Sequence, residues 1–301
     1  MSAVITPTPS AAPPEVLARL LESLPSLSPQ LRKAARYVLD HPAEVGVSSI
    51  SRLADAAGVK PNSLVRMARA VGYDGYEDFR EPFRDMIRSG RQDFPDRARW
   101  LQSIARGGRH GELLTEMARD IFANTESLFA GITTDAVKVA ADAIVEARVT
   151  YVLGVGVAYA VARNFAYLAG MALETVVAIP KDGSLPVDDL VRAGPGDVLL
   201  AMTFEPYRTE VVQAVDTARD QGVAIIAFTD SLASPIARDV AQVFCVPTVT
   251  AQFFTSTVAL GALFETLMAF VVADAPDEVV ASIERFHRHR HEIGVYWDEG
   301  H

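Results

Sequence analysis

The hydrophobic positions of the chain repeat with two different periods, and the change between them divides the sequence into two parts. Up to about residue 147, apolar residues recur at intervals of three and four, which is the period of amphipathic helices. From residue 149 onward, short apolar runs rich in β-branched residues alternate with helical segments. Runs of this kind lack polar alternation, as do strands of a parallel sheet that is buried on both faces. The pattern predicts an all-α N-terminal domain followed by an α/β domain.

Five apolar runs are predicted as strands, and helical segments separate most of them. The predicted strands are residues 149–154, 175–179, 197–204, 223–228 and 243–247. The predicted helices of this half are residues 112–129, 134–147, 157–171, 187–193, 208–221, 235–239 and 253–272. This alternation is typical of a doubly wound five-stranded parallel sheet, whose ligand site lies at the carboxyl ends of the strands.

The segment 47–71 contains two short helical patterns joined by a glycine. Ser48 and Ser49 are possible N-caps for the first helix, which Gly58 ends. Pro61 suits the first position of the second helix, because that position leaves its N–H unbonded in any case. Two short helices with a tight turn between them predict a helix-turn-helix.

Polar and basic residues occupy the outer face of this segment, while Leu64, Val65 and Ala68 are predicted to point inward. Short polar side chains can approach base edges, and long cations can reach base edges or phosphates. The residues predicted to contact DNA are Arg52, Lys60, Asn62, Ser63, Arg66 and Arg69. An ordinary helical hairpin with solvated arginines is the alternative that this segment alone leaves open.

Helical patterns on both sides of this segment complete a small domain over residues 28–88. One pattern runs from Ser28 to His41, and another follows the turn GYDGY. The stretches SPQLRKAARYVLDHPAEV and SSISRLADAAGVKPNSLVRMARAVGYDGYEDFREPFRDMI resemble the DNA-binding domain of the RpiR family of bacterial transcriptional regulators. Lys60 departs from that family, which often has a serine N-cap at this place. The resemblance implies that a SIS (sugar isomerase) domain follows as the effector sensor.

The later strand ends are spaced as in a SIS domain, and the resemblance implies an effector site there. The residues it assigns to the site are Gly154, Gly156, Ala158, Thr203, Glu205, Arg208, Thr209, Thr229 and Ser231. The family usually has a serine at the place of Ala158 and a serine-rich loop at the place of Glu205 and Pro206. Glu205 adds a negative charge and Pro206 removes an N–H donor, so we expect an effector of at most modest negative charge.

Two features of this site leave alternatives open. Arg208 either binds an anionic group of the effector or neutralises a neighbouring carboxylate. The turn GVGVAYA, residues 154–160, precedes a predicted helix and could hold an anion, or its glycines could serve strand–helix packing alone. A dinucleotide fingerprint would need a third glycine where Tyr159 stands, so the sequence argues against a nicotinamide cofactor. The effector could be a sugar phosphate, a sugar acid or a polyol.

The charge of the chain is unevenly distributed along the sequence. The net charge is −10, yet residues 1–90 carry 11 Lys and Arg against 10 Asp and Glu. The remaining residues carry 17 and 28, so the acidic excess lies in the second part. Residues 48–71 contain four cations and only one anion, Asp55. This segment is therefore locally basic although the whole chain is acidic.

Several chemical possibilities are disfavoured by their sequence context. Cys245 lies in the apolar run VFCVP and is predicted as a buried strand residue. His287, His289 and His291 alternate with arginines that would repel a cation, so we expect a solvated helix end, no metal site and no cofactor. The Pro- and Ala-rich start is predicted as a disordered tail, and no long uncharged apolar run follows. We therefore expect a cytoplasmic protein without a membrane partner.

Together these patterns lead to a domain plan and a functional hypothesis. The plan is a tail with a leading helix (1–27), a helix-turn-helix domain (28–88), a linker with a helix (89–133), a SIS-like domain (134–292) and a C-terminal tail (293–301). The preferred hypothesis is a transcriptional regulator that binds a double-stranded DNA operator and a small sugar-derived effector. A two-fold operator requires two recognition helices, so a homodimer or homotetramer is expected.

The competing hypothesis is an enzyme, a SIS-type sugar-phosphate isomerase. In it, Glu205 or Glu210 would move a proton and Arg208 would hold the phosphate. Such an enzyme would have no use for the helix-turn-helix segment, and this feature favours the regulator.

Overall fold

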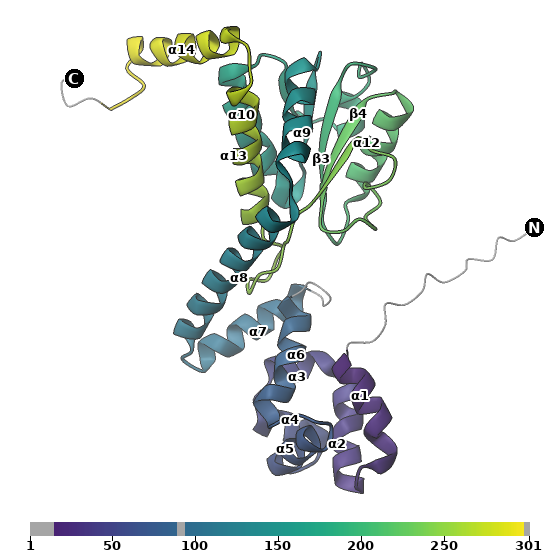
Figure 1. Cartoon of the computed structure of the whole chain (residues 1–301). Helices are drawn as coiled ribbons and strands as arrows, with labels where there is room; N and C mark the ends of the chain where they lie inside the picture. The colour runs from purple at the N-terminus through teal and green to yellow at the C-terminus, as the bar shows by residue number, and fades with distance from the viewer. Residues whose placement is uncertain (1–14, 89–93, 298–301) are drawn as a thin grey trace, which may run out of the picture. The chain divides into compact units, whose positions relative to one another are not determined.

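The computed structural model describes residues 15–88 and 94–297, which form two compact units (Figure 1). The first unit comprises the chain up to Leu114 together with Ala251–Phe254. The second comprises Thr115–Thr250 and the chain from Thr255 onward. The boundary therefore falls inside the long helix α8 (His110–Gly131). The tail predicted at the N-terminus and residues 89–93 of the predicted linker lie outside the described residues.

The first unit is entirely helical, as the sequence predicts. Its elements are α1 (Glu15–Ser23), η1 (Leu24–Ser26), α2 (Pro29–Asp40), α3 (Pro42–Val47), α4 (Ile50–Ala57), α5 (Pro61–Ala70), α6 (Tyr76–Arg88) and α7 (Phe94–Arg106). The sequence did not predict α3. α3 is a single short helix that begins directly after the C-cap of α2 at His41, so its six residues show no period of their own.

The turn between α4 and α5 follows from a few local interactions. The Ser49 hydroxyl accepts a hydrogen bond from the backbone N–H of Arg52 at 3.3 Å and caps α4, whereas Ser48 is buried and does not. Gly58 ends α4 with φ 61° and ψ 40°, a left-handed conformation that a side chain would strain. Lys60 takes the N-cap position of α5 without a side-chain cap, and Pro61 starts that helix. This geometry confirms the predicted helix-turn-helix.

A buried arginine fixes α3 against α6. Arg80 of α6 is 6% exposed, and its guanidinium donates to the carbonyl oxygens of Val45 at 3.0 Å and Gly46 at 3.1 Å. Burial lowers the pKa of Arg80, and the nearby Arg84 lowers it further. The two carbonyls lie at the end of α3, where a helix has no backbone donors left for them.

The second unit alternates strands and helices. After α8 it contains α9 (Thr134–Glu146), β1 (Thr150–Leu153), η2 (Gly156–Ala158), α10 (Tyr159–Ala172), β2 (Val176–Ile179), α11 (Pro186–Asp189), β3 (Val198–Met202), α12 (Thr209–Asp220), β4 (Ala224–Thr229), β5 (Gln242–Cys245), α13 (Val258–Ala273) and α14 (Asp277–Glu292). Three predicted helices need correction. The helix predicted for residues 187–193 ends at Asp189, the last residue of α11, and residues 190–193 are not helical. Residues 235–239 form turns, and α13 begins at Val258, five residues later than predicted.

The five strands form one parallel sheet in the order β2-β1-β3-β4-β5. The register aligns their carboxyl ends, with Leu153 opposite both Ile179 and Ala201, and Thr229 opposite Cys245. Helices α9, α10 and α13 cover one face, and α12 covers the other (Figure 1). The predicted doubly wound five-stranded sheet is confirmed.

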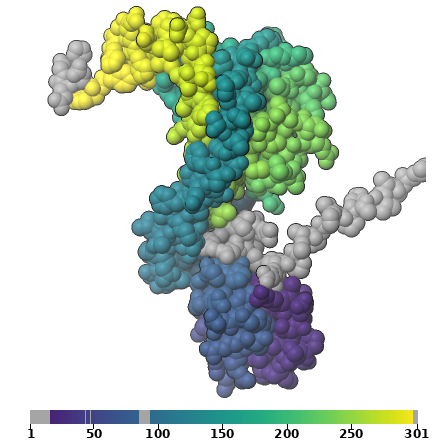
Figure 2. Space-filling view, viewed as in Figure 1, coloured from purple at the N-terminus to yellow at the C-terminus, as the bar shows by residue number. Residues whose placement is uncertain are grey.

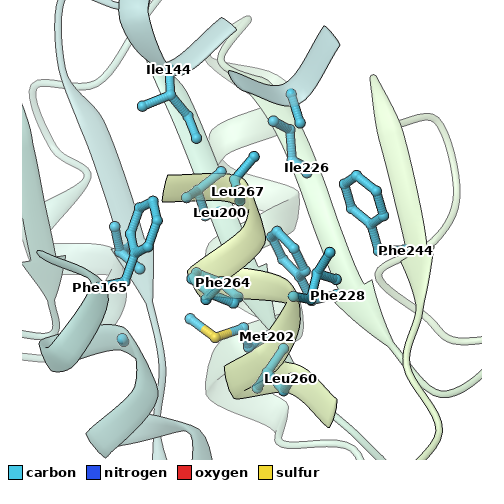
Figure 3. Packing of buried hydrophobic residues seen from close by; sticks show 14 of the residues in the cluster. Ile144, Phe165, Leu200, Met202, Ile226, Phe228, Phe244, Leu260, Phe264 and Leu267 are labelled. Atoms are coloured by element: carbon cyan, nitrogen blue, oxygen red, sulfur yellow. The ribbon is translucent and has the colours of Figure 1, made fainter. Parts of the chain in front are cut away.

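Successive residues of each strand enter two different cores. On β3, Leu200 and Met202 join the core under α9, α10 and α13, while Leu199 and Ala201 join the core under α12. In the first core, Phe264 of α13 contacts Phe165 and Phe228, with ring centroids 4.9 and 4.7 Å apart (Figure 3). A strand with both faces buried in this way has no solvated side, which explains its continuous apolar sequence.

Helix α13 owes its apolar sequence to this core. Figure 2 shows it packed beside α9, and its residues Leu260, Leu263 and Leu267 are fully buried. Within residues 15–88 and 94–297, no single helix is long and apolar enough to cross a membrane, although α13 and α14 pass that test together as a pair bent by 114°.

The Arg80 contacts lead to a stability prediction. Arg80→Met should lower the free energy of unfolding of the first unit by about 2–4 kcal/mol, because it leaves two buried carbonyls without a donor. Arg99→Met is the control, since Arg99 is 66% exposed in an ion pair with Asp96 and should change stability by less than about 1 kcal/mol. Urea unfolding followed by circular dichroism measures both. Equal effects of the two substitutions would contradict the role given to Arg80.

Candidate functional site

The outer face of α5 carries the residues predicted to contact DNA. Asn62, Arg66 and Arg69 are exposed and Ser63 is half-buried, while Met67 of the same helix is fully buried. The sequence, therefore, divides α5 into an anchored face and a free face. Arg52 of α4 and Lys60 at the start of α5 are exposed as well.

Three cations of this face have no carboxylate partner within the described part of the chain. Among the described residues, none of Arg52, Lys60 and Arg66 forms an ion pair with a carboxylate. Arg69 is held by its own unit, because its Nε donates to the carbonyl oxygen of Asp74 at 3.2 Å. An unpaired cation on a free helix face can bind phosphate without first breaking an internal pair.

One more cation lies at the helix-turn-helix and was missed from the sequence. The Lys33 ammonium of α2 donates to the carbonyl oxygen of Gly58 at 3.0 Å and so lies at the turn between α4 and α5. Residues 47–71 alone do not reveal it, because this contact joins residues 25 positions apart. The exposed position of Lys33 on α2 was the available signal.

The second candidate site is the carboxyl edge of the sheet. In a sheet of order β2-β1-β3-β4-β5, the connections leave β1 and β3 in opposite directions, and this switch point opens a crevice for ligands. Gly154, Gly156 and Ala158 follow β1, the segment 203–209 follows β3, and Thr229 ends β4. The predicted effector residues therefore come from neighbouring strand ends.

The glycines of the first turn have structural reasons of their own. A Cβ on Gly154 would lie 2.4 Å from the Ala158 carbonyl oxygen and 2.7 Å from the Ala162 Cβ. Gly156 has φ +58° with open space around it, and Ala158, the last residue of η2, is buried. Gly154 thus permits close strand–helix packing, whereas Gly156 provides a left-handed turn.

The loop after β3 is held by internal hydrogen bonds. The buried Thr203 hydroxyl accepts from the backbone N–H of Arg208 at 3.0 Å. The Arg208 guanidinium pairs with Glu210, with Nε 2.9 Å from Oε1, and this hydrogen bonding lowers the pKa of Glu210. Of the two roles left open for Arg208, the structure shows the second, because its guanidinium neutralises the carboxylate of Glu210. Thr209 is exposed at the start of α12.

Asp230, at the end of β4, is a site residue that the sequence analysis did not single out. Its Oδ2 accepts from the backbone N–H of Glu205 at 3.2 Å, and its Oδ1 accepts from the Thr229 hydroxyl at 3.2 Å. Ser231 is turned to its own loop, because its hydroxyl accepts from the N–H of Ala233 at 3.1 Å. The Asp230 carboxylate, which follows β4, therefore contacts the loop that follows β3.

The hydroxyl of Tyr207, in the loop after β3, hydrogen-bonds to the Asp230 carboxylate. Burial raises the pKa of the Tyr207 hydroxyl to about 12, and the charge of Asp230 contributes to the rise. Glu205 also raises this pKa. The tyrosine hydroxyl therefore stays protonated at neutral pH and remains a hydrogen-bond donor.

An open cavity of about 630 Å³ adjoins Asp230. Its walls are β5, the end of α8 and the start of α9, and Thr133 and Cys245 line it. The prediction of a buried Cys245 was wrong, because β5 is the edge strand of the sheet and the thiol is exposed. Partial desolvation raises the pKa of Cys245, and the charge of Asp230 adds to the rise, so the thiol stays protonated at neutral pH.

The histidines near the C-terminus are solvated, as predicted. His287, His289 and His291 are all exposed on α14. In the part of the chain that the structure describes, no three or more His, Cys, Asp or Glu side chains gather as a metal site would require.

Two protein families match the chain. Residues 15–88 match the helix-turn-helix domain of the rpiR family, and residues 143–273 match the SIS domain. The chain joins an rpiR-family helix-turn-helix domain to a SIS domain. The resemblance inferred from the sequence is thereby confirmed, and with it the assignment to transcription regulation.

Relatives of this two-domain regulator agree with the assignment. The chain is 24% identical over 231 residues to a helix-turn-helix transcriptional regulator of Caldanaerobacter subterraneus, covering 74% of this chain and 77% of the relative. It is 22% identical to the regulator HexR of Pseudomonas aeruginosa, covering 74% of this chain and 75% of HexR.

Among solved structures, the fold is similar to that of the Vibrio vulnificus NanR protein, which was solved in complex with ManNAc-6P. The TM-score is 0.55 at 19% identity, covering 94% of this chain and all of the NanR chain.

The close approach at Gly154 predicts unequal effects of two alanine substitutions in the SIS domain. Gly154→Ala should destabilise this domain by about 3 kcal/mol, because the new methyl meets backbone atoms of η2. Gly156→Ala should cost only about 1 kcal/mol, since it strains a positive φ in open space. Thermal unfolding of the purified variants measures the difference. If Gly156→Ala proves the more damaging change, the packing role assigned to Gly154 is wrong.

Proposed function

We propose that this regulator binds operator DNA through α5 and that a small sugar-derived molecule at the carboxyl edge of the SIS-domain sheet changes its affinity for DNA. The observation that carries the proposal is the free face of α5, with Asn62 and Arg66 exposed above a fully buried Met67. A helix of this kind fits the major groove, where arginine pairs with guanine and asparagine pairs with adenine.

The supporting contacts belong to the edges of α5. Arg52 of α4, Lys60 at the N-cap and Lys33 at the turn are exposed cations of the same helix-turn-helix. Cations around a recognition helix bind phosphates and fix its position on the duplex, without reading sequence. Operators of two-fold symmetry require a second copy of the chain, so we propose that a homodimer or a homotetramer binds DNA.

The sensor role rests on the SIS match and on the polar groups at the strand ends. Thr203, Glu205 and Asp230 bring hydroxyl and carboxylate oxygens to the switch point of the sheet, where folds of this order bind ligands. Oxygens of this kind are suited to sugar hydroxyl groups.

The isomerase alternative has less support from the same residues. A general base for sugar isomerisation needs a pKa raised toward neutrality. Glu210 has the opposite shift, because hydrogen bonding to Arg208 lowers its pKa. The guanidinium of Arg208 is also engaged by Glu210.

The DNA-binding proposal predicts the effect of removing Arg66. Arg66→Ala should weaken specific operator binding by about 1–3 kcal/mol if Arg66 reads a base edge, because the lost pair discriminates between bases. Arg285→Ala, which removes an exposed cation from α14, is the control and should leave binding unchanged. Mobility-shift titrations on DNA from upstream of the gene measure both. Unchanged operator affinity in a folded Arg66→Ala/Arg69→Ala variant would refute the assignment of α5.

The sensor proposal predicts coupling between the two domains. A compound that binds the sheet edge should change operator affinity by about 5- to 150-fold, the usual range for linked sites. Thermal-shift screening of sugars, sugar acids, polyols and sugar phosphates finds such compounds, because a ligand at 100 times its Kd stabilises by about 2.7 kcal/mol. Panel members that give no shift are the controls in the mobility-shift assay. A ligand that binds this edge and leaves operator affinity unaltered would contradict the sensor role.

A further inference from the structure

We propose that the effector of this regulator carries no phosphate and that Asp230 binds it through hydroxyl or ammonium donors. This inference rests on the proposed sensor function and adds the chemical class of the ligand. A SIS-type loop after β3 could bind a phosphate with its backbone N–H groups, so the partners of these groups and the charges around them decide which class of ligand fits.

Two backbone donors of the loop after β3 are already engaged. The Glu205 N–H donates to the Asp230 carboxylate, and the Arg208 N–H donates to the Thr203 hydroxyl. Pro206, between them, has no N–H. Asp230 therefore supplies, from inside the protein, the anionic oxygen that a phosphate would otherwise bring to this loop.

The charges around the loop also disfavour an anion. Glu205 is exposed next to Asp230, and the guanidinium of Arg208 is paired with Glu210. On the β2 side of the same edge, Arg163 lies 3.4 Å from a carboxylate oxygen of Asp182. Arg208 and Arg163 are thus both engaged by carboxylates, so a phosphate would have to break an ion pair to bind either of them.

Asp230 itself is well placed to accept a ligand's hydrogen bonds. In the described ranges, 15–88 and 94–297, its carboxylate accepts from the Glu205 N–H and the Thr229 hydroxyl, the Tyr207 hydroxyl is a third donor to it, and no Lys or Arg forms an ion pair with it. It also lines the open cavity of about 630 Å³ next to β5. A carboxylate has about four lone-pair sites, so three donors leave it able to accept one more. Hydroxyl and ammonium groups are the ligand donors that match it.

The test removes the two carboxylates and asks whether phosphate then binds. The probes are inorganic phosphate and the pair glucosamine and glucosamine 6-phosphate, titrated by calorimetry into the full chain at constant ionic strength. The variants are Glu205→Ser, Asp230→Asn and their combination. The matched control is Glu174→Gln, which removes one exposed carboxylate just before β2, at the opposite edge of the sheet.

The native protein and Glu174→Gln should bind neither inorganic phosphate nor the phosphorylated sugar more tightly than the unphosphorylated one. The double variant should bind inorganic phosphate at least tenfold more tightly than the native protein. Glu205→Ser alone should show part of this gain, and it keeps the test decisive if Asp230→Asn impairs folding, because Glu205 is exposed. Tighter binding of either phosphate by the native protein overturns the inference, and so does a double variant, or a Glu205→Ser variant, that gains nothing over Glu174→Gln.

The phosphate titrations and the test of the proposed function can fail independently of each other. Operator binding by the native protein without ligand is measured in the same buffers. A protein that fails to bind DNA refutes the regulator proposal, whatever the titrations show. A protein that binds DNA and prefers the phosphorylated sugar refutes only the inference about Asp230.

Discussion

The burial of both faces of the parallel sheet is the constraint on which the rest of the SIS domain depends. Each strand alternates its side chains between two apolar cores, so a polar side chain inside a strand would lose its water on either face. Charged groups are therefore confined to the strand ends. Asp197, just before β3, shows the rule, because Oδ2 of its buried carboxylate accepts from Arg148 and from the backbone N–H of Gly194.

The same constraint gathers the chemistry of the domain at one edge. Because all five strands are parallel and in register, the residues that follow them meet at their carboxyl ends. Which ligand these residues can bind depends on the hydrogen bonds and ion pairs that the loop groups already form with one another. A carboxylate about 4 Å from a phosphate costs about 4 kcal/mol per unit charge at an effective dielectric of 20. Asp230 and Glu205 therefore outweigh the small contribution of one hydroxyl such as that of Thr203.

The elements that the sequence predicts well are those with a local signal. The strands are marked by short continuous apolar runs. The two helices of the helix-turn-helix are marked by an apolar period, by the N-cap Ser49 and by the left-handed Gly58, all within a few residues. Helix α3 was missed because its six residues are too few to show a period, and its end depends on Arg80, 34 and 35 residues away. Residues 235–239 were read as a helix from their composition, yet the chain only turns there before it enters β5.

The candidate site was predicted in position but not in its connections. Topology places Gly154, Thr203 and Thr229 at neighbouring strand ends, and a parallel alternation of strands and helices is sufficient to infer this. The contact of Asp230 with the Glu205 N–H joins positions 25 residues apart, and no local pattern encodes it. The exposure of Cys245 likewise depends on β5 being the edge strand, a matter of strand order that apolar composition does not specify.

The uneven charge of the chain complements its division into two units. The first 90 residues are nearly neutral, and the acidic excess of the remaining sequence gives the SIS part a potential that repels DNA. In the proposed function, this acidic part leaves the small cationic face of α4 and α5 as the surface that a duplex can approach. The free cations there, Arg52, Lys60 and Arg66, then need only a local excess of charge, because the rest of the molecule excludes DNA from competing orientations.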